Sequence, residues 1–164
     1  CSSDLMTKVF EDEFMDWQAD MVAIAREYID DRAEKIYLYG SIEGGTYAFN
    51  LFYQINNKIV FMSKVNDALK NFEEKYDVSS DRRRKVLEIG VQDLKEIAEV
   101  CKKYDKPIPT QFKLYYDVQK NNLKAKYQYD LQYSNTEDLY TDDIFMAWYE
   151  EVKSAVENPQ EFGF

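Results

Sequence analysis

Two runs of alternating residues around Gly44-Gly45 constrain the fold more than any other part of this sequence. Within residues 34–53, apolar side chains recur at every second position on both sides of the glycine pair. They are Ile36, Leu38 and Ile42 before it, and Tyr47, Phe49, Leu51 and Tyr53 after it. Alternation with a period of two gives a strand one apolar face, and two glycines allow the positive φ of a tight turn. The segment therefore predicts a β-hairpin with one face in a core.

The two flanking regions predict a helix and further strands. Apolar residues in steps of three and four over residues 10–28 indicate a long amphipathic helix. Asn56-Asn57 tolerates the left-handed conformation and predicts a second hairpin, onto a strand over 59–63. A short helix is then expected from Asn66 or Asp67 to Tyr76.

The second half of the chain repeats these signals. Ser79, Ser80 and Asp81 offer caps for a longer helix, which Pro107 and Pro109 stop. Alternation over 112–118 and 125–131, joined at Asn121-Asn122, predicts two more strands. A last helix is capped by Thr141 or Asp142 and ends at Asn158-Pro159. Its expected inward residues are Phe145, Trp148, Val152 and Ala155.

The order of elements is therefore α-βββ-αα-ββ-α. The sequence contains no repeat and no linker rich in glycine or proline, so residues 1–164 are expected to form a single domain, with residues 1–8 as a flexible tether. Strands joined by hairpins pair antiparallel. We expect an α+β fold: a five-stranded, largely antiparallel sheet with helices packed on one face.

Charge is unevenly distributed along the 164 residues, whose formal net charge is −10. Residues 1–31 carry nine acids and two bases, residues 129–164 carry nine acids and one base, and residues 32–128 have a net charge of +5. This pattern is a poor footprint for nucleic acid, which favours a dominant basic face. It suits solubility and binding to a basic protein partner, and solvated helix faces are the alternative explanation.

The residue types exclude several classes of catalysis. Histidine is absent, which removes Ser-His-Asp and Cys-His catalysis and most zinc sites. The sequence also has no CxxC motif and no phosphate-binding glycine loop. We therefore expect no catalytic residue, no cofactor and no metal. An enzyme that uses a carboxylate pair stays open, and it would need two facing acids in a cleft, one with a raised pKa.

The two cysteines have different expected roles. The first residues, Cys1-Ser2-Ser3-Asp4, are similar to the start of a mature bacterial lipoprotein, in which the cysteine is lipidated. This predicts an extracytoplasmic protein that reaches the membrane only through a lipid at Cys1. A boundary that falls there by chance, with a cytoplasmic location, is the alternative. Cys101 lies on the apolar face of the long middle helix and is expected to be a buried thiol.

Five short motifs of aromatic, apolar and proline residues follow one another along the chain. The segment EKIYLYGSIEGGTYAFNLFY is followed by Pro107-Ile108-Pro109-Thr110, Phe112-Lys113-Leu114, Lys126-Tyr127-Gln128-Tyr129-Asp130 and Trp148-Tyr149. Over residues 10–153 this order resembles the YezG-like immunity proteins. Two departures are Thr110-Gln111, where that family usually has Trp, and Cys1, since most members act in the cytosol.

The resemblance implies an immunity protein, or antitoxin, for a toxin of the LXG type released by bacterial type VII secretion. Such a protein binds its cognate protein toxin stoichiometrically and inhibits it without catalysis. Export through Cys1 would make the toxin an extracytoplasmic one. The alternative function is a cell-envelope lipoprotein that binds a small molecule or an envelope component, which would need a concave apolar pocket.

If helices cover one sheet face, the other face is expected to bind the partner. Its residues mix aromatic and polar side chains, as protein-binding surfaces do. The predicted residues are Tyr37, Tyr39, Asn50, Phe52, Gln54, Lys113, Tyr115, Asp117, Lys126, Gln128 and Asp130. Tyr39, Phe52 and Tyr115 are the expected anchors, with Asp117 and Asp130 as charged partners. A loop or a terminus that covers some of these aromatics is the alternative.

Overall fold

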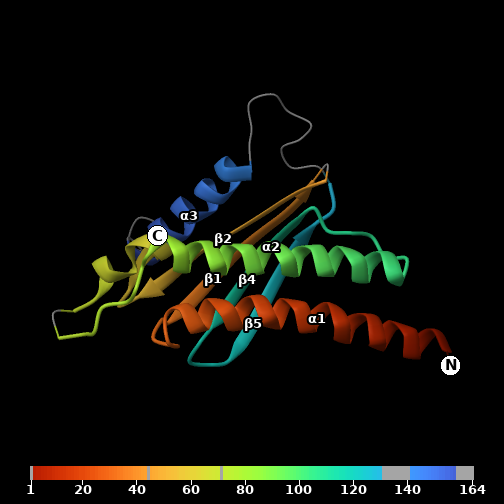
Figure 1. Ribbon diagram of the computed structural model, residues 1–164, viewed down its shortest axis with the longest axis horizontal. Helices are drawn as coiled ribbons and strands as arrows, with labels where there is room; N and C mark the ends of the chain where they lie inside the picture. The colour runs from red at the N-terminus through yellow and green to blue at the C-terminus, as the bar shows by residue number, and fades with distance from the viewer. Residues whose placement is uncertain (1, 44, 71, 131–140, 158–164) are drawn as a thin grey trace, which may run out of the picture.

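The computed structural model describes residues 2–43, 45–70, 72–130 and 141–157, which form a five-stranded antiparallel sheet with helices (Figure 1). The described elements are α1 (Ser2–Tyr28), β1 (Lys35–Glu43), β2 (Thr46–Ile55), β3 (Lys58–Phe61), the 3₁₀ helix η1 (Met62–Ala68), α2 (Ser80–Lys103), β4 (Gln111–Asp117), β5 (Asn122–Gln128) and α3 (Thr141–Glu157). The fold class, the antiparallel pairing and the predicted order of elements are confirmed.

The sheet has the strand order β3-β2-β1-β4-β5, with every neighbouring pair antiparallel. The central strand β1 pairs with β2 along its whole length, from Lys35↔Gln54 to Glu43↔Thr46. Strand β3 is short and pairs only with the last four residues of β2. Asn56 and Asn57 join β2 to β3 with φ of 51° and 62°, as a tight hairpin turn requires.

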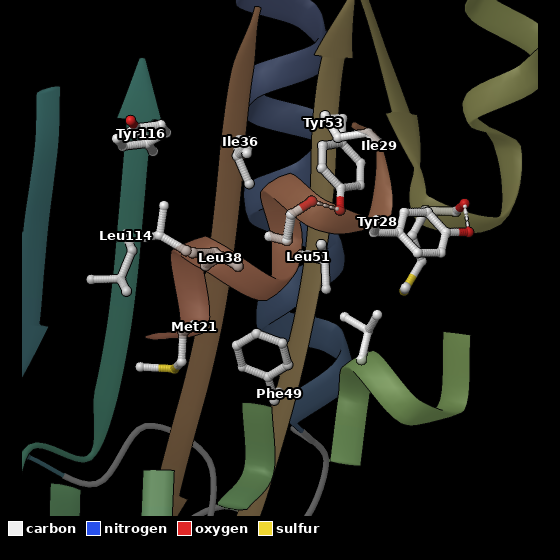
Figure 2. Packing of buried hydrophobic residues seen from close by; sticks show 14 of the residues in the cluster. Met21, Tyr28, Ile29, Ile36, Leu38, Phe49, Leu51, Tyr53, Leu114 and Tyr116 are labelled. Carbon is white, nitrogen blue, oxygen red and sulfur yellow. Dashed lines mark hydrogen bonds between the residues drawn. The ribbon is translucent and has the colours of Figure 1, made fainter. Parts of the chain in front are cut away.

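The main core lies between the sheet and the helices α1 and α2 (Figure 2). Buried apolar residues that alternate along β1, β2 and β4 point toward these helices. Two buried tyrosines are anchored there: Tyr28 Oη donates to Met62 O at 2.7 Å, and Tyr53 Oη donates to Ala25 O at 2.8 Å. Buried hydroxyls need such partners, so these bonds fix α1 against the sheet.

Helices cover both faces of the sheet, so the expectation of a single covered face is wrong. Figure 2 shows α3 behind β1 and β2, on the side away from the main core. A second buried cluster fills this side and contains Tyr37, Tyr39, Phe52, Ile59, Phe145 and Tyr149. The physical reason is that β1 and β2 are apolar on both faces, as the runs IYLY and LFY show. A helix that covers the second face removes its apolar side chains from water, and this burial stabilises the fold.

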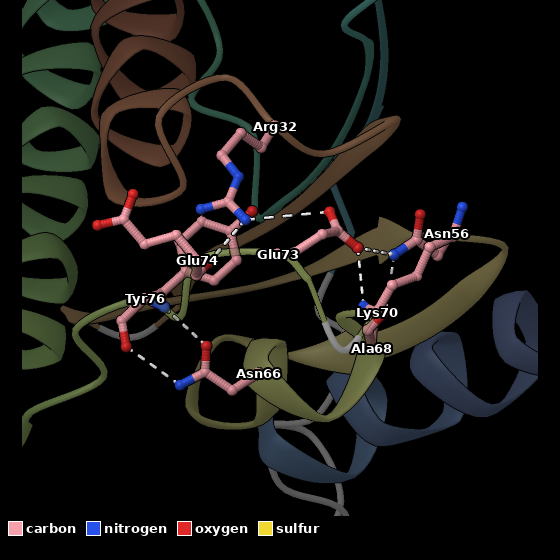
Figure 3. A network of polar contacts seen from close by, with 8 residues as sticks. All are labelled: Arg32, Asn56, Asn66, Ala68, Lys70, Glu73, Glu74 and Tyr76. Atoms are coloured by element: carbon pink, nitrogen blue, oxygen red, sulfur yellow. Dashed lines mark hydrogen bonds and ion pairs between the residues drawn. The ribbon is translucent and has the colours of Figure 1, made fainter.

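The short helix expected from Asn66 or Asp67 to Tyr76 is wrong in place and type. The 3₁₀ helix η1 ends at Ala68, and residues 69–79 are irregular where they are described. Side chains replace helical hydrogen bonds in this connection (Figure 3). Asn66 Oδ1 accepts from Tyr76 N–H at 2.7 Å, and Asn56 Nδ2 donates to Ala68 O and to Glu73 Oε1, both at 2.8 Å.

At the N-terminus, helix α1 begins at Ser2, so residues 2–8 are helical where a flexible tether was expected. Cys1 lies outside the described residues. Cys101 is fully buried, as predicted, and burial raises the pKa of its thiol.

Candidate functional site

Three of the predicted binding aromatics are buried beneath α3. Tyr37, Tyr39 and Phe52 are only 3%, 2% and 0% exposed. The ring centroid of Trp148 lies 5.1 Å from the centroid of Phe52 and 5.9 Å from that of Tyr37. The ring centroid of Phe145 lies 5.8 Å from that of Tyr39. The expectation that these aromatics face a partner on a helix-free surface is therefore wrong. A helix covers them.

Polar contacts fix α3 over β3 and β2. Tyr149 Oη donates to Ile59 O at 3.2 Å, and Glu157 Oε2 accepts from Ile59 N–H at 2.8 Å. The rings of Tyr149 and Phe61 also stack, with centroids 3.9 Å apart. Because α3 packs against β3 and β2, none of the described helices covers the β4–β5 half of the same face (Figure 1). We call this half the open half.

The open half carries the predicted residues of β4 and β5. The register aligns Tyr39, Lys113 and Lys126 across β1, β4 and β5, and it aligns Tyr37, Tyr115 and Lys124 in the next row. Lys113 and Tyr115 are half-buried, whereas Lys124 and Lys126 are exposed. Aligned residues in a sheet project from the same face. The open surface is thus a continuation of the aromatic face that α3 covers.

A surface pocket of about 400 Å³ lies where this open half meets α3. We call it the basic-aromatic pocket, and its lining residues are Lys113, Tyr115, Lys124, Lys126, Trp148 and Glu151. Lys113 Nζ lies over the Trp148 ring, 5.6 Å from the centroid, and Lys35 Nζ lies 5.4 Å from the centroid of Tyr115. The pocket therefore combines aromatic walls with ammonium groups.

The electrostatics of this pocket favour a negative partner. Burial lowers the pKa of Lys113, the charge of Lys126 lowers it further, and Glu151 opposes both effects. Among the ion pairs of the described residues, none includes Lys113, Lys124 or Lys126. A carboxylate placed between these lysines would offset their mutual repulsion and the desolvation of Lys113.

The other predicted residues have local structural contacts. Gln54 is 8% exposed and its Nε2 donates to Glu34 Oε1 at 3.2 Å. Asn50 lies at the opposite edge of the sheet, where its Oδ1 accepts from Leu51 N–H at 2.9 Å. Asp117 Oδ1 accepts from Lys120 N–H in the β4–β5 turn. The structure therefore separates Asn50 and Gln54 from the pocket.

Gln128 and Asp130 lie at the far end of the open half. Gln128 is exposed and pairs with Gln111 in the β4–β5 ladder. Asp130 is exposed, and its carbonyl accepts from Thr110 Oγ1 at 2.6 Å. Their exposed side chains extend the open surface beyond the pocket.

Sequence reasoning missed Lys124, Trp148 and Glu151 as site residues. Trp148 was expected only in the core, yet it is half-buried and forms one wall of the pocket. Lys124 shares the alternation of Lys126 on β5, which was a usable signal. Glu151 follows Trp148 by three residues and so lies near it on α3, but only the placement of α3 shows that it meets β4.

One buried carboxyl, that of Asp93, has the raised pKa that an enzyme would need. Asp93 on α2 is 2% exposed, and burial, a hydrogen bond with Asp20 on α1 and the charge of Glu96 raise its pKa to about 8. The two helices pack directly against each other at this pair. Neither Asp20 nor Asp93 lines the basic-aromatic pocket. The pair lies in the contact between α1 and α2, and burial favours the protonated form of Asp93 there.

Two other kinds of site are absent from the described part of the chain. No group of three or more cysteine and carboxylate residues is placed to hold a metal ion there. Likewise, none of the described helices combines the length and the apolar character that a bilayer crossing needs.

No protein-family model matches this chain, and no curated protein matches it either.

Proposed function

We propose that the protein neutralises a secreted bacterial toxin by binding it stoichiometrically, without catalysis, through the basic-aromatic pocket and the open β4–β5 surface. In this role it would be an immunity protein for an LXG-type toxin, as the resemblance to YezG-like proteins implies. The proposal makes the toxin a protein partner that presents carboxylates to Lys113, Lys124 and Lys126.

The observation that carries the proposal is the composition of the pocket. Lys113, Lys126 and Tyr115 come from the sheet, and Trp148 and Glu151 come from α3. Tyrosine and tryptophan supply much of the binding energy at protein interfaces because they bury a large area. The lysines beside them add charge complementarity to an acidic partner. Lys124 and Lys126 are exposed, so the surface of a protein partner can reach them.

The order of elements is compatible with the proposal. The immunity family is expected to follow hairpins with a helical pair, two strands and a terminal helix, and the described chain has this order. Fold alone does not establish function, so the pocket carries more weight than the topology.

Location is part of the proposal. If Cys1 is lipidated, the protein acts outside the cytoplasmic membrane and its toxin attacks the envelope. Metabolic labelling of cells with a palmitate analogue tests this: we expect label on the wild-type protein and none on Cys1→Ser. Unlabelled wild-type protein in the cytosolic fraction would contradict the lipid anchor and leave inhibition itself to be tested separately.

Co-expression with the toxin gene beside it tests inhibition. We expect wild-type protein to restore growth and to co-purify with the toxin at a 1:1 ratio. The double variant Lys113→Glu/Lys126→Glu should lose both properties. The matched control Lys75→Glu/Lys85→Glu makes the same charge change at exposed sites away from the pocket and should protect fully.

The rival function, a cell-envelope lipoprotein for a small molecule or envelope component, predicts a different result. The toxin would then kill cells that express wild-type protein, and no complex would form. That outcome would overturn the proposed inhibition.

A further inference from the structure

The outer edge of β2 lacks a partner strand over most of its length in the described chain. Strand β3 pairs only from Phe52↔Phe61 to Ile55↔Lys58, and η1 then begins at Met62. Residues 46–51 of β2 therefore pair with β1 on one side and with no described strand on the other. An unpaired edge presents backbone N–H and C=O groups that can template another strand.

The hairpin fixes which groups point outward. A two-residue turn at Asn56-Asn57 makes Ile55 and Lys58 a hydrogen-bonded pair, so the backbone groups of Ile55 point toward β3. Alternation then points the N–H and C=O of Leu51, Phe49 and Tyr47 away from β1. Those of Tyr47 and Phe49 form no hydrogen bond with other described residues.

Asn50 blocks one of these outward groups. Its Oδ1 accepts from Leu51 N–H at 2.9 Å, where a neighbouring strand would otherwise supply a carbonyl. This contact is local and involves a half-buried side chain. It therefore competes with an incoming strand without closing the edge.

A groove runs beside this edge between α2 and α3. A hollow of about 400 Å³ adjoins Asn50, and its other walls include Phe61, Met62, Arg83, Leu87 and Phe145. The α2 wall continues to Lys95, whose Nζ lies 5.7 Å from the centroid of the Tyr47 ring. The edge thus has a hollow beside Asn50, which follows Phe49 in the strand, and most of the walls of this hollow are apolar.

The positive charge along the groove favours an acidic occupant. None of the ion pairs in the described chain includes Arg83 or Lys95, whereas Arg84 is paired with Asp81 and Glu88. Arg83, whose Nε donates to Val78 O at 3.0 Å, and Lys95 thus flank Leu87 and Val91 along the α2 wall. Glu88 lines the same wall, and its charge is offset by Arg84. A strand with alternating carboxylate and apolar side chains is complementary to this wall.

We infer that residues 47–51 of β2 are a docking site for an extended acidic segment of another polypeptide, which joins the sheet as an added strand. The segment's backbone pairs with Tyr47 and Phe49, and its carboxylates face Arg83 and Lys95. This site lies at the opposite edge of the sheet from the basic-aromatic pocket and does not depend on the proposed toxin binding.

The probe is a capped hexapeptide of alternating glutamate and valine, added to ¹⁵N-labelled full-length protein. We expect saturable binding by NMR and amide exchange at Tyr47 and Phe49 that is at least tenfold slower with the peptide. A peptide with lysine in place of glutamate is the matched probe control and should give neither effect.

Two substitutions at one position separate backbone pairing from side-chain contact. Tyr47→Pro removes the outward N–H without removing a bond to β1, and Tyr47→Ala keeps that N–H but removes the ring. We expect Tyr47→Pro to weaken peptide binding at least tenfold and Tyr47→Ala to weaken it less than threefold. Asn50→Ala frees Leu51 N–H and should strengthen binding several-fold. Native amide spectra of all three variants establish that they fold.

Four results would overturn the inference. The first is equal weakening by Tyr47→Pro and Tyr47→Ala, which would indicate side-chain contact only. The second is equal binding of the lysine peptide. The third is protection of Tyr47 and Phe49 that rises with protein concentration in the absence of peptide, which would make a second copy of the chain the occupant. Absence of any protection at millimolar glutamate peptide would also exclude strand addition.

Discussion

Asp93 connects the packing of α1 and α2 to pH. Its carboxyl is buried between the helices, and its hydrogen bond with the Asp20 carboxyl requires that one of the two acids hold a proton. Burial favours the neutral form, and the charges of Asp20 and Glu96 add to this preference. The folded state therefore binds this proton more tightly than the unfolded chain does.

The sign of the resulting pH dependence follows from linkage. The pKa of Asp93 is raised from 3.8 to about 8 in the folded state, so its contribution to stability is fully present below pH 3.8 and is lost as pH rises through 8. Between these values the free energy of unfolding falls by up to about 1.4 kcal/mol per pH unit. Urea unfolding of the wild type at pH 5.5 and pH 8 measures this loss.

Asp93→Asn should remove most of this pH dependence, because the amide is neutral and can still donate to Asp20. At pH 8 the variant should be more stable than wild type, and at pH 5.5 the difference should be small. Glu99→Gln, an exposed change on the same helix, is the control and should keep the wild-type slope. An unchanged slope in Asp93→Asn would show that other groups cause the pH dependence.

At the scale of elements, close contact between α2 and β2 depends on Gly90. A Cβ at this position would lie 2.1 Å from the ring of Phe49. Alanine normally stabilises a helix interior by ~0.5–1 kcal/mol relative to glycine, but overpacking in a core costs ~1–3 kcal/mol. We expect Gly90→Ala to destabilise the protein by about 1–2 kcal/mol in thermal or urea unfolding.

A double-mutant cycle identifies the cause of that loss. Phe49→Leu shortens the ring that the new Cβ would meet, so Gly90→Ala should cost less in the Phe49→Leu background. Additive effects of the two changes would contradict a direct clash between α2 and β2.

The placement of α3 reverses the earlier expectation for the aromatic residues beneath it. Phe52 is fully buried against Phe145 and Trp148, so Phe52→Ala should lower the free energy of unfolding by ~3–5 kcal/mol. Tyr115 is half-buried, and its edge-to-face contact with Tyr37 contributes only ~0.5–1.5 kcal/mol. Tyr115→Ala should therefore cost much less than Phe52→Ala in urea unfolding, and equal costs would contradict the burial pattern.

These elements show what the sequence could predict. Period-two alternation located β1, β2, β4 and β5, since the pattern depends only on which residues are neighbours along each strand. It could not tell which face α3 would cover, because both faces of β1 and β2 are apolar. The Asp20–Asp93 pair and the pocket around Trp148 were also beyond prediction, because each joins residues from elements far apart in the chain.

For the whole molecule, the distribution of charge and the placement of α3 together define the surface that can bind. The net charge is −10, yet the open β4–β5 half presents Lys113, Lys124 and Lys126 beside Trp148. A local basic surface on an acidic protein both attracts an acidic partner and orients it, because the rest of the molecule repels that partner. The proposed inhibition depends on this contrast.

The affinity of the purified protein for the toxin encoded beside it, measured by calorimetry, tests this proposal most directly. We predict a 1:1 complex, weakened on the order of 100-fold by Lys113→Glu/Lys126→Glu and unchanged by Lys75→Glu/Lys85→Glu. No complex with the wild-type protein would contradict inhibition by binding. A complex that Lys113→Glu/Lys126→Glu leaves at full affinity would contradict the basic-aromatic pocket as its site.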